Sequence, residues 1–283
     1  MRTYHAWRAL MAVICTSLLS GCAGLFLSPA ERVDTQARAG QFQPVPSVTG
    51  PIKAWLRATP RTMPDAAPDA PLTVYIEGDG AHWRGPYRPP ADPTPDNALT
   101  LRLALRDPSA RVAYLGRPCQ YLDEEALARC APSLWIRARY GDTALKIVNA
   151  AIDNLKQAAG APRLQLVGFS GGGAIAMLIA ARRADVTCVV TLASPLDTAA
   201  WISALDLSPL TESHNPFDSA PRLRFVAQTH FAAAEDKIVP SATLSETREA
   251  LPYARFEMMP GYDHDCCWVQ AWRALRARSC LSE

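Results

Sequence analysis

The sequence lacks a strong charge imbalance, an internal repeat, a low-complexity segment and a long hydrophobic run. Its 283 residues hold 29 lysines and arginines against 27 aspartates and glutamates, a formal net charge of +2. So small an excess gives no electrostatic reason to expect a nucleic-acid partner. Cys-x-x-Cys spacings are absent, and the adjacent residues of 263–267 cannot all converge on one ion. We therefore expect no metal and no cofactor.

The N-terminus has the pattern of a targeting segment. Arg2 and Arg8 precede a short apolar stretch over 9–18, which is too short to span a bilayer. Small residues then lead to Cys22, and this resembles a bacterial lipoprotein processing site. The resemblance implies that residues 1–21 are a signal peptide and that Cys22 is lipid-modified. An ordinary secretory signal or a buried helix is the alternative.

The remaining chain has no net charge, because the signal contains two basic and no acidic residues. Residues 22–50 are rich in Ala, Gln, Pro and Ser and are expected to be a tether, followed by one domain over 51–283. Ala23, rather than an aspartate, follows Cys22. By resemblance to known lipoproteins, this implies the outer membrane of a bacterial cell envelope, facing the periplasm.

Strand and helix patterns alternate from residue 72 to the end. They predict an α/β fold, with a mostly parallel central sheet and helices on both faces. Residues 61–71 are predicted to be a loop, and 194–221 to be less regular. Strands are expected at 52–59, 72–77, 111–115, 163–167, 186–193, 222–228 and 254–258, and helices at 98–106, 142–157, 172–183, 242–250 and 267–278.

Ser170 is the strongest functional candidate. It lies in Gly-Phe-Ser-Gly-Gly-Gly over 168–173, between a predicted buried strand and a predicted helix. This arrangement is typical of a nucleophile elbow, a sharp turn that exposes a serine hydroxyl beside a helix N-terminus. The oxyanion formed during acyl transfer needs two backbone N–H donors. We expect one from Gly171 and the other from the glycine-rich turn after the strand at 72–77, with Asp79 favoured and Gly80 second.

A serine nucleophile needs a base and an acid, in the chain order serine, acid, histidine for this strand–helix arrangement. His264 lies in the loop between the last strand and the last helix and is the expected base. Asp236 is the expected acid, with Glu235 and Asp197 as alternatives. The other histidines, which fit this order less well, are His5, His82, His214 and His230.

An exported chain can form disulfides. Two cysteines that flank a short loop, Cys119 and Cys130, are the preferred pair. Cys280 is expected to pair with Cys266 or Cys267 at the two ends of the last helix. Cys188, in an apolar strand, is expected to be a buried free thiol.

Four strings give the chain a family resemblance: 75–80, 116–121, the elbow, and 263–268. Over residues 72–272 the chain resembles the α/β-hydrolase superfamily, and more narrowly a group of bacterial α/β-hydrolase-type lipoproteins. The resemblance implies Ser170 as nucleophile, Asp236 as acid and His264 as base, with esterase, lipase, thioesterase or peptidase activity. Two departures are Glu77 in place of the usual histidine of the oxyanion loop, and alanines where a glycine often precedes the acid.

Together these features predict a lipid-anchored serine hydrolase with a small-molecule acyl substrate, carboxylic esters being the default. The segment 194–221 is short for a lid, which favours small or exposed substrates. A binding or scaffolding lipoprotein that retains the fold without turnover is the alternative. Five aromatic residues either line an acyl pocket or, as we favour, mostly pack in the core: Trp83, Trp135, Tyr140, Trp201 and Trp268.

Overall fold

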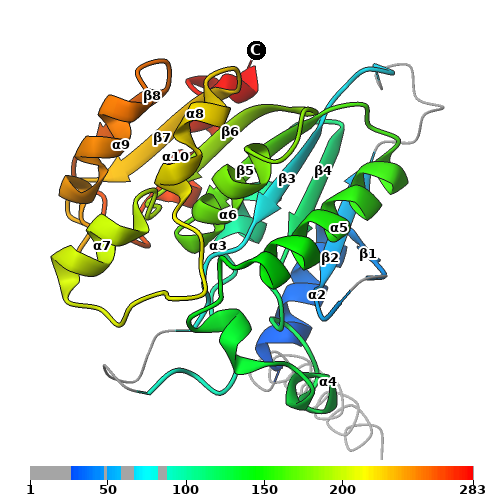
Figure 1. Ribbon diagram of the computed structural model, residues 1–283. Helices are drawn as coiled ribbons and strands as arrows, with labels where there is room; N and C mark the ends of the chain where they lie inside the picture. Colours follow the sequence, from blue (N-terminus) through cyan, green and yellow to red (C-terminus); the bar gives the residue numbers. More distant parts are fainter. Residues whose placement is uncertain (1–26, 48–49, 59–66, 82–87, 283) are drawn as a thin grey trace, which may run out of the picture.

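A computed structural model describes residues 27–47, 50–58, 67–81 and 88–282. Its centre is an eight-stranded sheet with the strand order β1-β2-β4-β3-β5-β6-β7-β8 (Figure 1). The strands are β1 Gln43–Val45, β2 Ala54–Ala58, β3 Leu72–Ile76, β4 Arg111–Leu115, β5 Leu164–Phe169, β6 Val186–Leu192, β7 Ala227–Ala233 and β8 Arg255–Met259.

The sheet is mostly parallel, as the alternating pattern predicted. Strands β3 to β8 pair in parallel, whereas β1 pairs antiparallel with β2, and β2 pairs antiparallel with β4. Parallel strands end at the same edge of a sheet. The segments that follow β3, β5, β7 and β8 therefore meet at this edge, and they contain Asp79, Ser170, Asp236 and His264.

Helices cover both faces of the sheet. Helices α5, α6, α8 and α9 pack on one face, and α2, α3 and α10 pack on the other (Figure 1). The helices are α2 Pro29–Ala39, α3 Leu99–Ala104, α4 Glu124–Ala128, α5 Asp142–Ala159, α6 Gly171–Ala180, α7 Thr198–Leu205, α8 Ala220–Leu223, α9 Ser245–Ala250 and α10 Trp268–Ala277.

Helices α5 and α6 differ in their apolar pattern because they lie at different depths. Along α5, apolar residues recur at helical spacing, and Val148, Ile152 and Leu155 are fully buried against the sheet. In α6 every residue is buried. Burial on all sides fixes α6, and its N-terminus, relative to β5 and the site.

The tether expectation is wrong for residues 29–45. Ser28 caps α2 in a reciprocal capping box with Glu31, and Val33, Ala37 and Phe42 are buried in the core. Strand β1 then pairs with β2 at the edge of the sheet. Ser-Pro-Ala-Glu over 28–31 is a capping-box pattern that predicts a helix start. The Ala, Gln, Pro and Ser content of the segment had instead favoured a tether.

The strand expected at 222–228 is also misplaced, since the structure has α8 at Ala220–Leu223 and β7 at Ala227–Ala233. His230 consequently lies inside β7 and is 1% exposed. Its Nδ1 lies 2.8 Å from Thr191 Oγ1, and its Nε2 lies 3.3 Å from Gln228 Oε1. The segment expected to be less regular contains a further short helix, α7.

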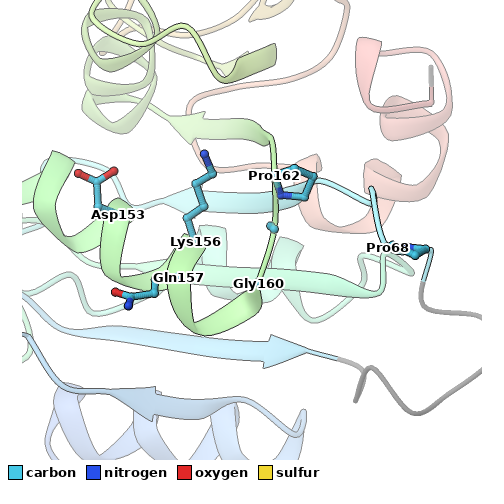
Figure 2. Close-up of a pocket in the computed structure, with 7 residues that line it drawn as sticks. Pro68, Asp153, Lys156, Gln157, Gly160 and Pro162 are labelled. Carbon is cyan, nitrogen blue, oxygen red and sulfur yellow. The ribbon is translucent and has the colours of Figure 1, made fainter.

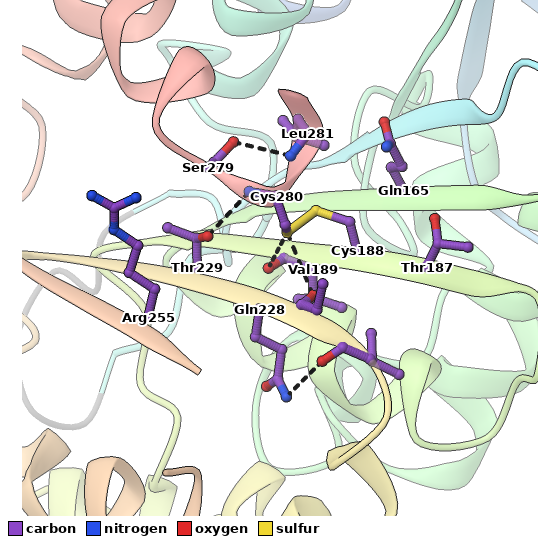
Figure 3. The surroundings of a disulfide bond; sticks show 12 residues. Gln165, Thr187, Cys188, Val189, Gln228, Thr229, Arg255, Ser279, Cys280 and Leu281 are labelled. Carbon is purple, nitrogen blue, oxygen red and sulfur yellow. Dashed lines mark hydrogen bonds between the residues drawn. A yellow bond between two sulfur atoms is a disulfide. The ribbon is translucent and has the colours of Figure 1, made fainter. Parts of the chain in front are cut away.

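Of the disulfide expectations, the Cys119–Cys130 bond is present. The free-thiol expectation for Cys188 is wrong, because Cys188 in β6 is bonded to Cys280 at the C-terminus (Figure 3). The two residues are 92 positions apart, with Cα atoms separated by 5.8 Å. The two cysteines meet because the C-terminal segment packs against β6 and β7. A local sequence pattern does not predict a contact of this kind.

The pairing of Cys280 with Cys266 or Cys267 is wrong for a geometric reason. Helix α10 has 10 residues and is therefore about 15 Å long, whereas a disulfide joins Cα atoms about 4–7 Å apart. Cysteines at opposite ends of this helix cannot reach each other. Cys266 and Cys267 are instead bonded to one another just before α10.

Within the described residues, no helix combines the length and the apolar character needed to cross a membrane. The expected signal peptide and the expected lipidation site, Cys22, lie outside the described residues. Ala23, His82 and Trp83 also lie outside them.

The buried His230 predicts a specific pH dependence of stability. Burial lowers the pKa of His230 from 6.5 to about 3. Between these values the unfolded chain binds the extra proton, so the free energy of unfolding decreases as the pH falls from 6.5 toward 3. Between pH 7 and pH 5, the wild type should lose about 2 kcal/mol more stability than His230→Gln. Urea unfolding at both pH values measures this difference, and equal losses would contradict it.

Candidate active site

Ser170 occupies a strained turn between β5 and α6. Its φ of 51° and ψ of −129° are unusual for a residue with a side chain. The Ser170 N–H donates to the carbonyl of Leu192, and the Ser170 carbonyl accepts from the N–H of Gly173. The turn is so tight that a Cβ at position 168 would lie 2.3 Å from the carbonyl oxygen of Gly172. Only glycine fits there.

A chain of hydrogen bonds connects Ser170 to two residues from later loops. His264 Nε2 lies 3.1 Å from Ser170 Oγ, and His264 Nδ1 lies 2.8 Å from Asp236 Oδ2. His264 and Asp236 are 7% and 6% exposed. With the proton on Nδ1, the free Nε2 can accept the proton of the serine hydroxyl. The structure thus brings the three predicted residues together, and their catalytic role stays a prediction.

Asp236 is oriented by its own loop, which follows β7. Its Oδ1 accepts hydrogen bonds of 2.8 Å from the N–H groups of both Ile238 and Val239. These bonds leave Oδ2 for His264. The neighbouring alternative, Glu235, has an exposed side chain, and its backbone N–H donates to the carbonyl of Tyr262.

The other alternative acid, Asp197, has a different role. Its Oδ1 accepts hydrogen bonds from the N–H groups of Ala199 and Ala200, so it caps the N-terminus of α7. The same oxygen accepts from Asn215 Nδ2 at 2.9 Å. The Asp197 carboxylate is therefore engaged by its own helix and by Asn215.

His264 is fixed from two sides. Its carbonyl accepts a 2.9 Å hydrogen bond from the indole N–H of Trp268, the first residue of α10. Its ring also lies 5.0 Å, between centroids, from the ring of Phe169, the last residue of β5. These contacts hold the imidazole next to the elbow.

The loop after β3 lies against the elbow, where the oxyanion donors are expected. A Cβ at Gly78 would lie 3.5 Å from Ser170 Cβ. Among the described residues, the N–H groups of Gly171, Asp79 and Gly80 donate to no protein acceptor. All three expected donors are therefore free to bind a substrate oxygen, and which pair does so stays a prediction.

Glu77 is buried below the site and is 2% exposed. Its carboxylate accepts hydrogen bonds from the Gly78 N–H, the Thr100 hydroxyl and the Tyr114 hydroxyl. Burial raises the pKa of Glu77, although these hydrogen bonds oppose the shift. Glu77 thus fixes the start of the oxyanion loop rather than presenting a charge to the substrate.

Sequence reasoning missed a buried charged cluster beside Ser170. The carboxylate of Asp79 accepts hydrogen bonds from Arg117, Arg139 and Tyr140. Arg117 belongs to the 116–121 string that contributed to the family resemblance, which was the one available signal. Nothing in the sequence around Arg139 indicated a contact 60 residues away in the chain.

Most of the expected aromatic residues pack rather than line a described cavity. Trp135 and Trp268 are buried, and Tyr140 is fully buried against Asp79. Trp201 is half-buried and donates to the carbonyl of Ile238.

An open pocket at the end of α5 is lined by Asp153, Lys156, Gln157 and Pro162, among others (Figure 2). It lies before β5 begins, at the opposite end of this strand from Ser170.

Comparisons with known proteins identify the fold. No protein-family model and no curated protein matches the sequence. Many solved structures do resemble it. One is Est1E from Butyrivibrio proteoclasticus, with a TM-score of 0.59 and 12% identity, covering 84% of this chain and 96% of that chain.

Two further structures have the same architecture. A puromycin-hydrolyzing peptidase from Mycobacterium tuberculosis has a TM-score of 0.62 and 17% identity, covering 85% of this chain but only 39% of that chain. A putative dienelactone hydrolase from Klebsiella pneumoniae has a TM-score of 0.52 and 20% identity, covering 83% and 95%. The chain therefore has the α/β-hydrolase fold, as the sequence predicted.

The two aspartates permit a matched test of the acid. Asp236→Asn should lower kcat by about 10⁴-fold, because an amide cannot hold the imidazole in the required tautomer or stabilise its charge. Asp197→Asn should leave kcat within about twofold, because asparagine also caps a helix. Ester hydrolysis by both purified variants measures the contrast. Loss of activity in Asp197→Asn alone would show that the acid is Asp197.

Proposed function

We propose that this chain, built on the α/β-hydrolase fold, is a serine hydrolase acting through Ser170, His264 and Asp236. The hydrogen-bonded series Oγ–Nε2 and Nδ1–Oδ2, at 3.1 and 2.8 Å, is the observation that supports the proposal most. Two structural neighbours, named as a puromycin-hydrolyzing peptidase and a putative dienelactone hydrolase, also support a hydrolase function.

In the first step, His264 Nε2 accepts the Ser170 hydroxyl proton as Oγ bonds to the substrate carbonyl carbon. The carbonyl oxygen becomes an oxyanion, which accepts hydrogen bonds from the N–H groups of Gly171 and Asp79. His264 then donates this proton to the leaving alkoxide oxygen as the carbonyl re-forms and the carbon–oxygen bond to that oxygen breaks. An acyl-enzyme on Ser170 remains.

In the second step, His264 accepts a proton from water as the water oxygen attacks the acyl carbon. The bond to Ser170 Oγ breaks, Oγ regains the proton, and the carboxylic acid leaves. In both steps the Asp236 carboxylate accepts the Nδ1 hydrogen bond and stabilises the transient imidazolium. The helix dipole of α6, whose N-terminus follows Ser170, further favours the negative charge.

Carboxylic esters are the proposed substrates, with thioesters and amides as the other acyl classes. The segment between β6 and β7 contains helix α7, which has only 8 residues and is therefore about 12 Å long. So short an element favours small or exposed acyl groups. One neighbour, Est1E, has also been solved with ferulic acid bound, which concerns that protein alone.

A binding or scaffolding lipoprotein is the rival function. Two observations favour catalysis over it. The backbone at Ser170 is held in a strained conformation, which costs about 1–3 kcal/mol and gives a binding protein no evident advantage. In addition, His264 and Asp236 are nearly fully buried, yet they are hydrogen-bonded in series to Ser170, a residue that is only partly buried.

We further propose a lipid on Cys22 that holds the protein at a bacterial envelope membrane. Helix α2 begins at Pro29 with Ser28 as its cap. Six residue steps separate Cys22 from Ser28, which span about 20 Å at most. A lipid at Cys22 would therefore keep the domain close to the membrane surface, on a shorter tether than the composition predicted.

The proposed activity predicts turnover that depends on Ser170. Wild-type protein should hydrolyse at least one ester in a screen of short and long acyl esters, thioesters and amides. Ser170→Ala should lose this turnover almost completely, because removing the nucleophile prevents the acyl-enzyme. Product release followed by absorbance measures both rates. Turnover that persists in folded Ser170→Ala would exclude Ser170 as the nucleophile, and none in the wild type would favour the binding protein.

The proposed anchor predicts that wild-type protein fractionates with membranes and that Cys22→Ser does not. Immunoblots of membrane and soluble fractions from expressing bacteria measure this distribution. Membrane association of Cys22→Ser equal to that of the wild type would contradict lipidation at Cys22.

A further inference from the structure

Two arginines and a tyrosine hold the carboxylate of Asp79. Arg117 Nη1 lies 2.8 Å from Oδ1, while Arg139 Nη1 and the Tyr140 hydroxyl lie 3.0 and 2.6 Å from Oδ2. Arg117 also donates to the carbonyl of Arg139 at 2.6 Å, which links the two segments directly. Arg117 and Arg139 are both buried residues, 4% and 9% exposed. The carboxylate thus has fixed partners on both of its oxygens.

The same carboxylate lies directly over the start of α6. A Cβ at Gly171 would lie 2.0 Å from Asp79 Oδ1, so no other residue fits while Asp79 keeps its place. Gly171 provides one expected oxyanion donor, and Asp79 itself provides the other. The side chain of one donor residue is therefore packed against the backbone of the other.

The rest of the oxyanion loop is held independently. The Gly78 N–H donates to Glu77, and the Gly78 carbonyl accepts from Gln120 Nε2 at 3.0 Å. The Gly78 carbonyl and the Asp79 N–H share one planar peptide, so Gln120 helps to set the direction of that N–H. The side chain of Asp79 holds the same peptide at its other end, through the Asp79 Cα.

Charge gives the cluster a second role. Burial alone would raise the pKa of Asp79, but Arg139 and Arg117 outweigh it and lower the pKa below its usual value. Asp79 is therefore ionised beside the place where an oxyanion develops. The two guanidinium groups are paired with this charge, so the ionised carboxylate is not left uncompensated beside the oxyanion position.

We propose that Arg117, Arg139 and Tyr140 are positioning residues that hold Asp79 so that its N–H and that of Gly171 reach one oxyanion together. The inference rests on the proposed hydrolase function. The Cys119–Cys130 disulfide supports the same arrangement, because it joins the loop of Arg117 to the segment leading to Arg139.

The test compares Arg139→Gln with Arg137→Gln. Arg137 lies two residues away in the same segment, but it is exposed and pairs with Glu212 at the surface. Arg139→Gln should lower kcat for an ester hydrolysed by the wild type by about 10- to 100-fold, with KM changed less than about threefold, because a displaced donor weakens only transition-state binding. Arg137→Gln should leave both constants within about twofold.

A transition-state analogue provides a readout that a merely structural role would not change. For Arg139→Gln, the inhibition constant of a trifluoromethyl ketone should rise by the same factor as kcat falls, because this inhibitor forms the tetrahedral oxyanion. Tyr140→Phe removes a single hydrogen bond and keeps the ring. Tyr140→Phe should lower kcat about 3- to 10-fold. The double variant that combines Arg139→Gln with Tyr140→Phe should show a smaller fold-loss of kcat than the product of the two single losses.

The inference is wrong if Arg139→Gln retains kcat within twofold of Arg137→Gln. It is also wrong if KM for an acidic ester rises while kcat is unchanged, since the arginines would then contact the substrate. Should Arg139→Gln not fold by circular dichroism, Tyr140→Phe decides, and unchanged kcat in that variant overturns the inference. Wild-type protein without turnover would instead overturn the proposed function itself.

Discussion

Ser170 joins a fully buried strand to a fully buried helix through a backbone conformation that side-chain-bearing residues rarely adopt. Burial of β5 and α6 supplies the free energy that keeps this turn closed, since a strained residue of this kind costs about 1–3 kcal/mol. The turn determines where the serine hydroxyl points. It also places the first N–H of α6 beside that hydroxyl, so the proposed nucleophile and the proposed oxyanion donor depend on the same constraint.

The parallel sheet brings three other loops to the edge where this turn lies. Asp79, Asp236 and His264 come from loops after three other strands, and they reach Ser170 because those strands end at the same edge. Each loop is then fixed by its own short-range contacts. Examples are the two N–H donors to Asp236 and the indole donor to the His264 carbonyl.

Local and periodic features were predictable from the sequence. The elbow, the central strands, α5 and α10 follow from residue patterns that span a few turns or strands. The candidate residues Ser170, Asp236 and His264 followed from their order in a recognisable fold. Helix α2 was not predicted, although the spacing of Ser28 and Glu31 is that of a capping box. The composition of the segment favoured a tether instead.

The remainder depended on long-range packing. The bond between Cys188 and Cys280 requires the C-terminal segment to pack against β6. Neither segment predicts this contact by itself. The salt bridges of Asp79 to Arg117 and Arg139 join three segments, and charged residues are ordinarily expected at the surface. The sequence therefore predicted a role only for the backbone N–H of Asp79, whereas its side chain has three hydrogen-bond partners in the structure.

The central claim is that Ser170 is an activated nucleophile, and covalent labelling tests it most directly. Folded wild-type protein treated with a fluorophosphonate should gain one phosphonyl group per chain, which peptide mass spectrometry should locate on Ser170, while Ser170→Ala should gain none. Wild-type protein that stays unlabelled, or equal labelling of Ser170→Ala, would contradict the account.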